Sequence, residues 1–130
     1  MPHFVDTNVV VYAYALTPKT ERAAELLKGA HISVQVLNEF ANVSLRKLGY
    51  LPAELEWRIT SIRGQVSAIS IIDEPTHDLA RQINARYKFS FYDCVLVASA
   101  LLAECDTLYS EDMQNGMVIE GCLTIRNPFV

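Results

Sequence analysis

The stretch His3-Phe4-Val5-Asp6-Thr7-Asn8 joins a short apolar run to an acid, and it decides the expected fold. His3-Phe4-Val5 predicts a first strand, and Asp6 follows it directly. In an open α/β sheet, ligands bind in the crevice outside the carboxyl ends of the strands. The Asp6 carboxylate is therefore expected at such a crevice. The simpler alternative is that Asp6 only caps the next helix, because Asp is a common N-cap residue.

Helical and strand-like segments alternate along the rest of the chain, which predicts a three-layer α/β/α sandwich around a mostly parallel central sheet. Thr17-Pro18 has the pattern of an N-cap followed by proline at the first helical position. The segment 92–103 is apolar on nearly every face and is expected to be a buried helix. The other expected helices cover 17–28, 33–49, 53–64 and 76–87, and the other strands cover 30–33, 66–72, 107–110 and 123–126.

The bulk composition fits one globular domain over residues 1–130, with one sizeable core. Apolar residues make up 51% and charged residues 20%, which argues against disorder. The formal net charge of -4 provides no global attraction for nucleic acid. The three cysteines form no CxxC pair, so a reducing cytoplasm is expected. The longest apolar stretch, 94–103, is shorter than the roughly 20 residues that a membrane span needs, so no membrane contact is expected.

Three further acids, Glu39, Asp93 and Asp112, follow at or near other expected junctions between strands and helices. Four carboxylates in one crevice repel one another unless they are protonated or paired with a cation. Mg²⁺ prefers a few carboxylate oxygens and keeps water and phosphate oxygens as its other ligands. The pattern therefore indicates a metal-dependent enzyme that acts on phosphate esters.

Each of these acids also has a simpler interpretation. Glu39 shares a helix edge with Asn42 and Arg46, at spacings i, i+3 and i+7, and such a stripe often only faces water. Asp93 is the third residue after Ser90, as in a capping box, although a helix N-terminus also favours the ionised carboxylate that a metal requires.

The fourth acid is ambiguous because two acids are adjacent. The simpler interpretation of Asp112 is a turn residue, because Asp is common in turns. Glu111 beside it competes for any catalytic role. Other chemistries find no support, because the chain has no phosphate-binding GxxxxGK[ST] loop, no GxGxxG, no HExxH and no GxSxG.

Four short motifs in order together resemble the PIN domain, and in particular the VapC-type toxins of bacterial toxin–antitoxin pairs. They are Phe4-Val5-Asp6-Thr7-Asn8, Asn38-Glu39-Phe40, Phe91-Tyr92-Asp93 with its apolar helix, and Thr107-Leu108-Tyr109-Ser110-Glu111-Asp112. The resemblance covers essentially the whole chain. It implies a metal-dependent ribonuclease, usually a homodimer, that a small cognate antitoxin inhibits.

The resemblance also assigns roles to individual residues. Asp6, Glu39 and Asp93 match the first three acids of the family, and Asp112 falls where many members place the fourth. Asn8 and Ser110 match polar positions that support the acids, with Glu111 a third supporting candidate. The expected reaction is hydrolysis of an RNA phosphodiester, with one or two Mg²⁺ or Mn²⁺ ions held by Asp6, Asp93 and Asp112. Glu39 is expected either to complete the metal shell through water or to act as general base.

Contacts to the RNA backbone need cations, and the candidates are Arg46, Lys47, Arg86 and Lys88. Two other classes of protein remain open. One is a Mg²⁺-dependent phosphatase or phosphotransferase of the haloacid-dehalogenase type, but the position two beyond Asp6 is Asn8, where those enzymes carry a second aspartate. The other is a catalytically inactive module that binds a partner, which the presence of all four acids disfavours.

Overall fold

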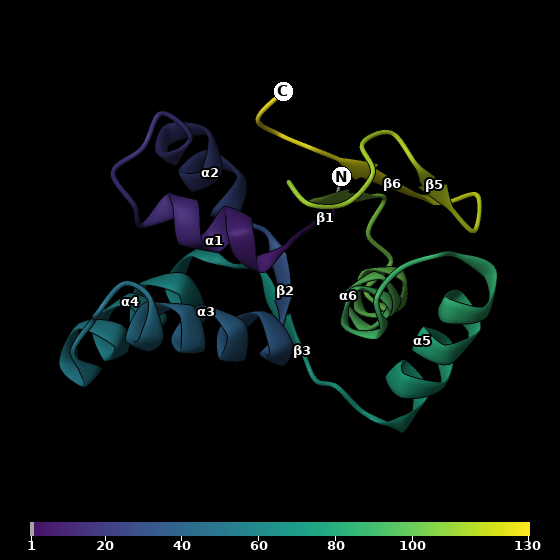
Figure 1. The fold of residues 1–130 in the computed structure, drawn as a ribbon, viewed down its shortest axis with the longest axis horizontal. Helices are drawn as coiled ribbons and strands as arrows, with labels where there is room; N and C mark the ends of the chain where they lie inside the picture. Colours follow the sequence, from purple (N-terminus) through teal and green to yellow (C-terminus); the bar gives the residue numbers. More distant parts are fainter. Residues whose placement is uncertain (1) are drawn as a thin grey trace.

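The computed structural model describes residues 2–130, and in it helices and strands alternate along the chain (Figure 1). The strands are β1 (His3–Val5), β2 (His31–Ser33), β3 (Ala68–Ser70), β4 (Thr107–Tyr109), β5 (Val118–Ile119) and β6 (Leu123–Arg126). The helices are α1 (Thr7–Ala13), α2 (Thr20–Leu27), α3 (Val34–Arg46), α4 (Pro52–Gln65), α5 (Glu74–Arg86) and α6 (Phe91–Leu102).

The strands form one sheet in the order β3-β2-β1-β4-β6-β5. All neighbouring pairs are parallel except β5 and β6, so the predicted mostly parallel sheet is confirmed. β5 was not expected. It has two residues and pairs with β6 across a turn in which Glu120 and Gly121 have positive φ angles of 51° and 70°. Two residues are too few to give a strand periodicity in the sequence.

Helices cover both faces of the sheet, which confirms the predicted three-layer arrangement. Figure 1 shows α1, α2, α3 and α4 on one side, and α5 and α6 on the other. The expected burial of the apolar helix is also confirmed, because seven consecutive residues of α6, Cys94–Ala100, are buried. In the part of the chain that the structure describes, no helix has both the length and the apolar character to cross a membrane.

Serine and aspartate caps fix where several helices begin. The Ser33 hydroxyl accepts from Val36 N at 3.4 Å and caps α3. The Ser90 hydroxyl accepts from Asp93 N at 3.3 Å, so the cap predicted at Ser90 forms. Asp73 caps α5 by accepting from Thr76 N, and the helix therefore begins two residues before the expected Thr76.

Two further expected helix boundaries are wrong. Thr17-Pro18 does not start α2, because Thr17 Oγ1 accepts from Lys19 N at 3.1 Å and forms a local turn, and the helix begins at Thr20. At the other boundary, α3 ends at Arg46 and not at 49. Leu48, within the expected helix, therefore lies beyond it and is 45% exposed.

Candidate active site

The first acid reaches the edge of the sheet through the pairing of β1 with β4. Val5 pairs with Tyr109, and Asp6 N donates to Tyr109 O at 2.9 Å, so Asp6 and Ser110 leave the sheet side by side. The Ser110 hydroxyl then donates to Asp6 Oδ2 at 2.8 Å, while Thr7 N donates to Asp6 Oδ1 at 2.7 Å. Asp6 therefore caps α1 and also presents its carboxylate at the sheet edge, so its two interpretations are compatible.

The four acids that the sequence singled out line the same cleft, which has a volume of about 380 Å³. They come from four separate parts of the fold: the end of β1, the middle of α3, the first turn of α6 and the loop after β4. The full lining consists of Asp6, Thr7, Asn8, Val11, Tyr12, Glu39, Val43, Lys47, Asp93 and Asp112.

Glu39 is held toward the cleft by two side chains. The Thr7 hydroxyl donates to Glu39 Oε2 at 3.2 Å, and Gln35 Nε2 donates to Glu39 Oε1 at 2.8 Å. Glu39 is exposed, so it is not an isolated buried charge. The contact with Thr7 connects α3 to the first residue of α1.

Asn8 connects the first acid to the loop after β4. Its Nδ2 donates to Asp112 Oδ2 at 3.2 Å and lies 3.5 Å from Asp6 Oδ2, and its Oδ1 accepts from Glu111 N at 3.4 Å. The amide therefore bonds to the backbone of this loop as well as to the Asp112 carboxylate. This contact places Asp112 on the wall of the cleft.

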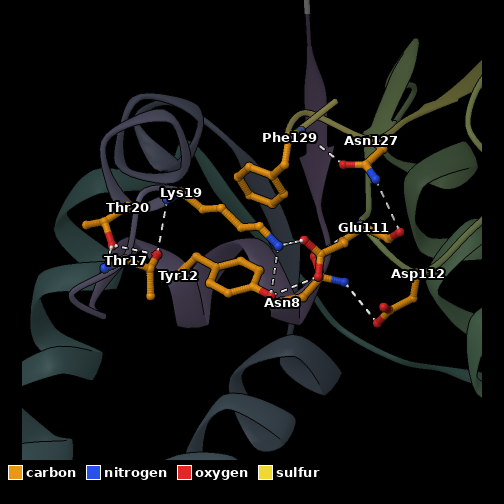
Figure 2. A network of polar contacts seen from close by, with 9 residues as sticks. All are labelled: Asn8, Tyr12, Thr17, Lys19, Thr20, Glu111, Asp112, Asn127 and Phe129. Carbon is orange, nitrogen blue, oxygen red and sulfur yellow. Dashed lines mark hydrogen bonds and ion pairs between the residues drawn. The ribbon is translucent and has the colours of Figure 1, made fainter.

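The neighbouring acid points to a different group of residues. Figure 2 shows Glu111 directed at Lys19 and Tyr12, away from Asp112. Lys19 forms an ion pair with the Glu111 carboxylate, and the Tyr12 hydroxyl donates to Glu111 Oε1 at 2.8 Å. The Lys19 ammonium also lies 4.7 Å and 5.5 Å from the ring centroids of Tyr12 and Phe129. Asn127 Nδ2 donates to Glu111 O at 3.5 Å, so these contacts fix the loop from both sides.

These contacts leave Asp112, and not Glu111, on the wall of the cleft. Hydrogen bonds from Lys19 and Tyr12 lower the pKa of Glu111, which keeps its carboxylate charged and bound to the two donors. Sequence reasoning did not identify Lys19 or Tyr12. It also passed over Thr7 and Gln35, which hold Glu39. The only available signal was the polar run Asp6-Thr7-Asn8, which contains Thr7.

Burial raises the pKa of Asp6 to about 6, and hydrogen bonds from Ser110 and from Thr7 N only partly offset that rise. The negative charges of Glu39 and Asp93 raise it further. The ionised form of Asp6 is therefore unfavourable in this cleft unless a positive charge accompanies it.

Asp93 has the same character. Burial raises its pKa, the Ser90 hydroxyl lowers it, and the charges of Glu39 and Asp112 raise it again. Within residues 2–130, no three acidic, histidine or cysteine side chains converge closely enough to form a completed metal site. The donors nevertheless fit a hard divalent cation, because they are carboxylate oxygens whose mutual repulsion such a cation would relieve.

Two further hollows flank the acid cleft along α3. One, of about 420 Å³, is lined by Gln35, Asn38, Glu39, Asn42 and Tyr92 and shares Glu39 with the cleft. The other, of about 310 Å³, is lined by Asn42, Val43, Arg46 and Lys47 and shares Val43 and Lys47 with it. Glu39, Asn42 and Arg46 thus line a row of adjoining hollows, which together form the groove along α3.

The four candidate cations occupy different places. Lys47 lines both the cleft and the 310 Å³ hollow beside it. Arg46 lines this hollow but not the cleft. Arg86 forms an ion pair with Glu120, and Lys88 lines none of these three hollows. Among the candidates, only Arg46 and Lys47 therefore adjoin the acids.

Comparison with protein families gives a match to the PIN domain over residues 3–114. Comparison with curated proteins gives no match.

Solved structures share the fold at low sequence identity. A chain of a toxin–antitoxin complex from Klebsiella pneumoniae has a TM-score of 0.74 and 16% identity, over 99% of this chain and 98% of that one. The VapBC2 complex from Rickettsia felis, bound to a DNA fragment from its promoter, gives 0.70 and 17%, over 98% of this chain and 100% of that one. The sarcin–ricin loop cleaving toxin VapC20 of Mycobacterium tuberculosis gives 0.67 and 20%, over 85% of this chain and 89% of that one.

Proposed function

The chain belongs to the PIN domain family, and on that premise we propose that it is a metal-dependent ribonuclease and the toxin of a toxin–antitoxin pair. The observation that carries the proposal is the gathering of Asp6, Glu39, Asp93 and Asp112 around one cleft. The similar fold of a toxin that cleaves the sarcin–ricin loop supports RNA as the substrate.

Asp6, Asp93 and Asp112 are the residues that would hold one or two Mg²⁺ or Mn²⁺ ions. When bound, such a cation lowers the pKa of a coordinated water and offsets the charge that develops on the phosphoryl oxygens. The protein's contribution is to keep the carboxylates in place. Ser110 and Thr7 N orient Asp6, and Asn8 orients Asp112.

In this proposal, Glu39 is the acid outside the metal-binding set and takes or relays a proton. Its carboxylate lies across the cleft from Asp6, and Thr7 and Gln35 each donate to one of its oxygens. Both donors leave the second lone pairs of those oxygens available to a water. This geometry suits a general base for the attacking water or an acceptor for water of the metal shell.

The substrate backbone would follow the groove along α3. Lys47 lines the cleft, and Arg46 follows it in the adjoining hollow, so a phosphate next to the scissile one would meet positive charge there. The net charge of -4 makes this local placement necessary for binding a polyanion. Arg46 and Lys47 are the cations that we assign to this role.

The toxin role rests on the similarity to chains of toxin–antitoxin complexes. By that likeness, the proposed partner is a cognate antitoxin. A second copy of this chain as partner and a cytoplasmic setting are proposed from the family resemblance alone. We propose that such a partner inhibits by covering the groove along α3, whose hollows share lining residues with the acid cleft.

An assay of RNA and para-nitrophenyl phosphate side by side tests the proposed activity. RNA cleavage that EDTA abolishes and Mn²⁺ restores, with no hydrolysis of the small ester, is the expected result. Hydrolysis of the ester alone would indicate a phosphatase instead. No activity on either substrate with Mn²⁺ present would leave a partner-binding module as the better account.

A further inference from the structure

The hollow that adjoins the acid cleft on the side of α6 differs chemically from the cleft itself. An aromatic ring and three amide side chains surround it, and no lysine or arginine lines it. It shares Glu39 with the acid cleft, so a ligand that fills it lies directly beside the proposed reaction centre. A negatively charged phosphate would be repelled by Glu39 here, whereas a neutral group would not.

Tyr92 supplies the aromatic surface of this hollow. It is the second residue of α6, immediately before Asp93, and it is 72% exposed. Its backbone O accepts from Gln35 Nε2 at 3.3 Å, which ties the backbone to α3 independently of the ring. Across residues 2–130, no other aromatic side chain packs against the Tyr92 ring. Tyr92 thus lines the hollow with most of its side chain uncovered.

Asn38 and Asn42 supply its polar edge. They are one turn apart on α3 and both are exposed. In the described part of the chain, neither side-chain amide has a hydrogen-bond partner, whereas Gln35 is already bonded to Glu39 and Tyr92 O. Each free amide offers a donor and an acceptor, the pattern that pairs with the edge of a nucleobase.

We infer that this hollow is a subsite for one unpaired nucleobase of the RNA, stacked on Tyr92 and hydrogen-bonded by Asn38 and Asn42. The inference rests on the proposed function and adds to it the form of RNA that is recognised. Aromatic side chains stack on bases only where the strand is unpaired, because a duplex hides the faces of its bases. The strand would then lie along α3, with a base in this hollow and a phosphate near Arg46 and Lys47.

A scan with abasic nucleotides tests the subsite directly. The substrate is an unpaired oligoribonucleotide that the wild-type protein cuts with Mn²⁺, and single abasic nucleotides replace each position near the cut in turn. One position next to the cut is expected to lower kcat/KM by roughly 5- to 100-fold, the usual range for a stacked base. Tyr92→Ala should lower cleavage of the intact RNA by a similar factor and remove the sensitivity to that position, and Tyr92→Phe should retain both.

Trp57→Ala is the matched control, because Trp57 is a 65% exposed aromatic residue on α4 that lines none of the three hollows. It should behave as wild type. A wild-type protein that cuts every abasic substrate equally well would overturn the subsite while the nuclease function stands. The subsite is overturned as well if Tyr92→Ala keeps the full abasic sensitivity. A wild-type protein that cuts no RNA with Mn²⁺ present would instead count against the proposed function. That result is distinguishable from failure of the subsite, in which RNA is still cut.

Discussion

Replacing Asp6 by asparagine is expected to stabilise the metal-free protein, although it removes a proposed metal ligand. The folded-state pKa of Asp6 is about 6 because of burial and neighbouring charges, whereas the unfolded value is about 3.9. At pH values well below about 3.9 the carboxyl is protonated in both states and costs nothing. As the pH rises, the unfolded state ionises first, so the wild type loses stability until the pH passes the folded pKa.

The size of this loss follows from the two pKa values. At about 1.4 kcal/mol for each pH unit between them, ionised Asp6 costs the wild type about 3 kcal/mol at pH 7.5. An asparagine can still cap α1 and accept from Thr7 N. Its amide nitrogen cannot accept the hydrogen bonds that Ser110 and Asn8 donate to Asp6 Oδ2. The expected net gain is therefore about 1–3 kcal/mol at pH 7.5 and close to zero or negative at pH 4.

Urea unfolding of both proteins in EDTA at pH 4 and pH 7.5 measures this gain, with Asp78→Asn on the exposed side of α5 as control. Mn²⁺ should then stabilise the wild type, by about 2.7 kcal/mol at a hundred times its dissociation constant, and stabilise the Asp6→Asn protein much less. An Asp6→Asn protein that is less stable than wild type by the same amount at both pH values would refute the reasoning, because it would show no charge penalty at Asp6.

Three other predictions concern the remaining acids. At saturating Mn²⁺ and subsaturating RNA, Asp112→Ala should cleave RNA on the order of tenfold or more slowly than Glu111→Ala does. This difference equals at least about 1.4 kcal/mol in barrier. A greater loss in Glu111→Ala would assign the fourth acid to Glu111. Glu111→Gln should lower the stability at neutral pH, because hydrogen bonds from Lys19 and Tyr12 lower the folded pKa of Glu111. This stabilisation is lost as the pH falls through the folded pKa, so unfolding curves should differ from wild type more at pH 7 than at pH 3. Expression of the wild type alone in bacteria should slow growth and Asp93→Asn should not, whereas harmless expression of an active wild type would remove the toxin role.

The sequence predicted most of the fold because its strongest signals are local. The strand before Asp6 and the apolar helix over 92–103 each carry a clear pattern within a few residues, and both form. The boundaries that failed depend on competing local bonds, as where Thr17 bonds to Lys19 N instead of capping a helix.

The candidate site was predictable only in part, for a related physical reason. Asp6 and Asp112 were predictable because the ends of β1 and β4 meet at one edge of the sheet. The expected strand-to-helix junctions were wrong for the other two, because Glu39 lies within α3 and Asp93 follows the loop between α5 and α6, yet all four line one cleft. The contact between Glu111 and Lys19 joins residues 92 positions apart, and no local pattern announces it. For the same reason, the hollow beside Tyr92 appears only when α3 and α6 are placed together.

The most direct test of the central claim is the rate at which Asp6→Asn cleaves RNA at saturating Mn²⁺, with circular dichroism showing that the fold is intact. Because a neutral amide is a poorer ligand for a hard cation than a carboxylate, the rate is expected to fall to that of the wild type in EDTA. A folded Asp6→Asn protein that cuts RNA at the wild-type rate would contradict the assignment of this cleft as a metal-dependent nuclease site.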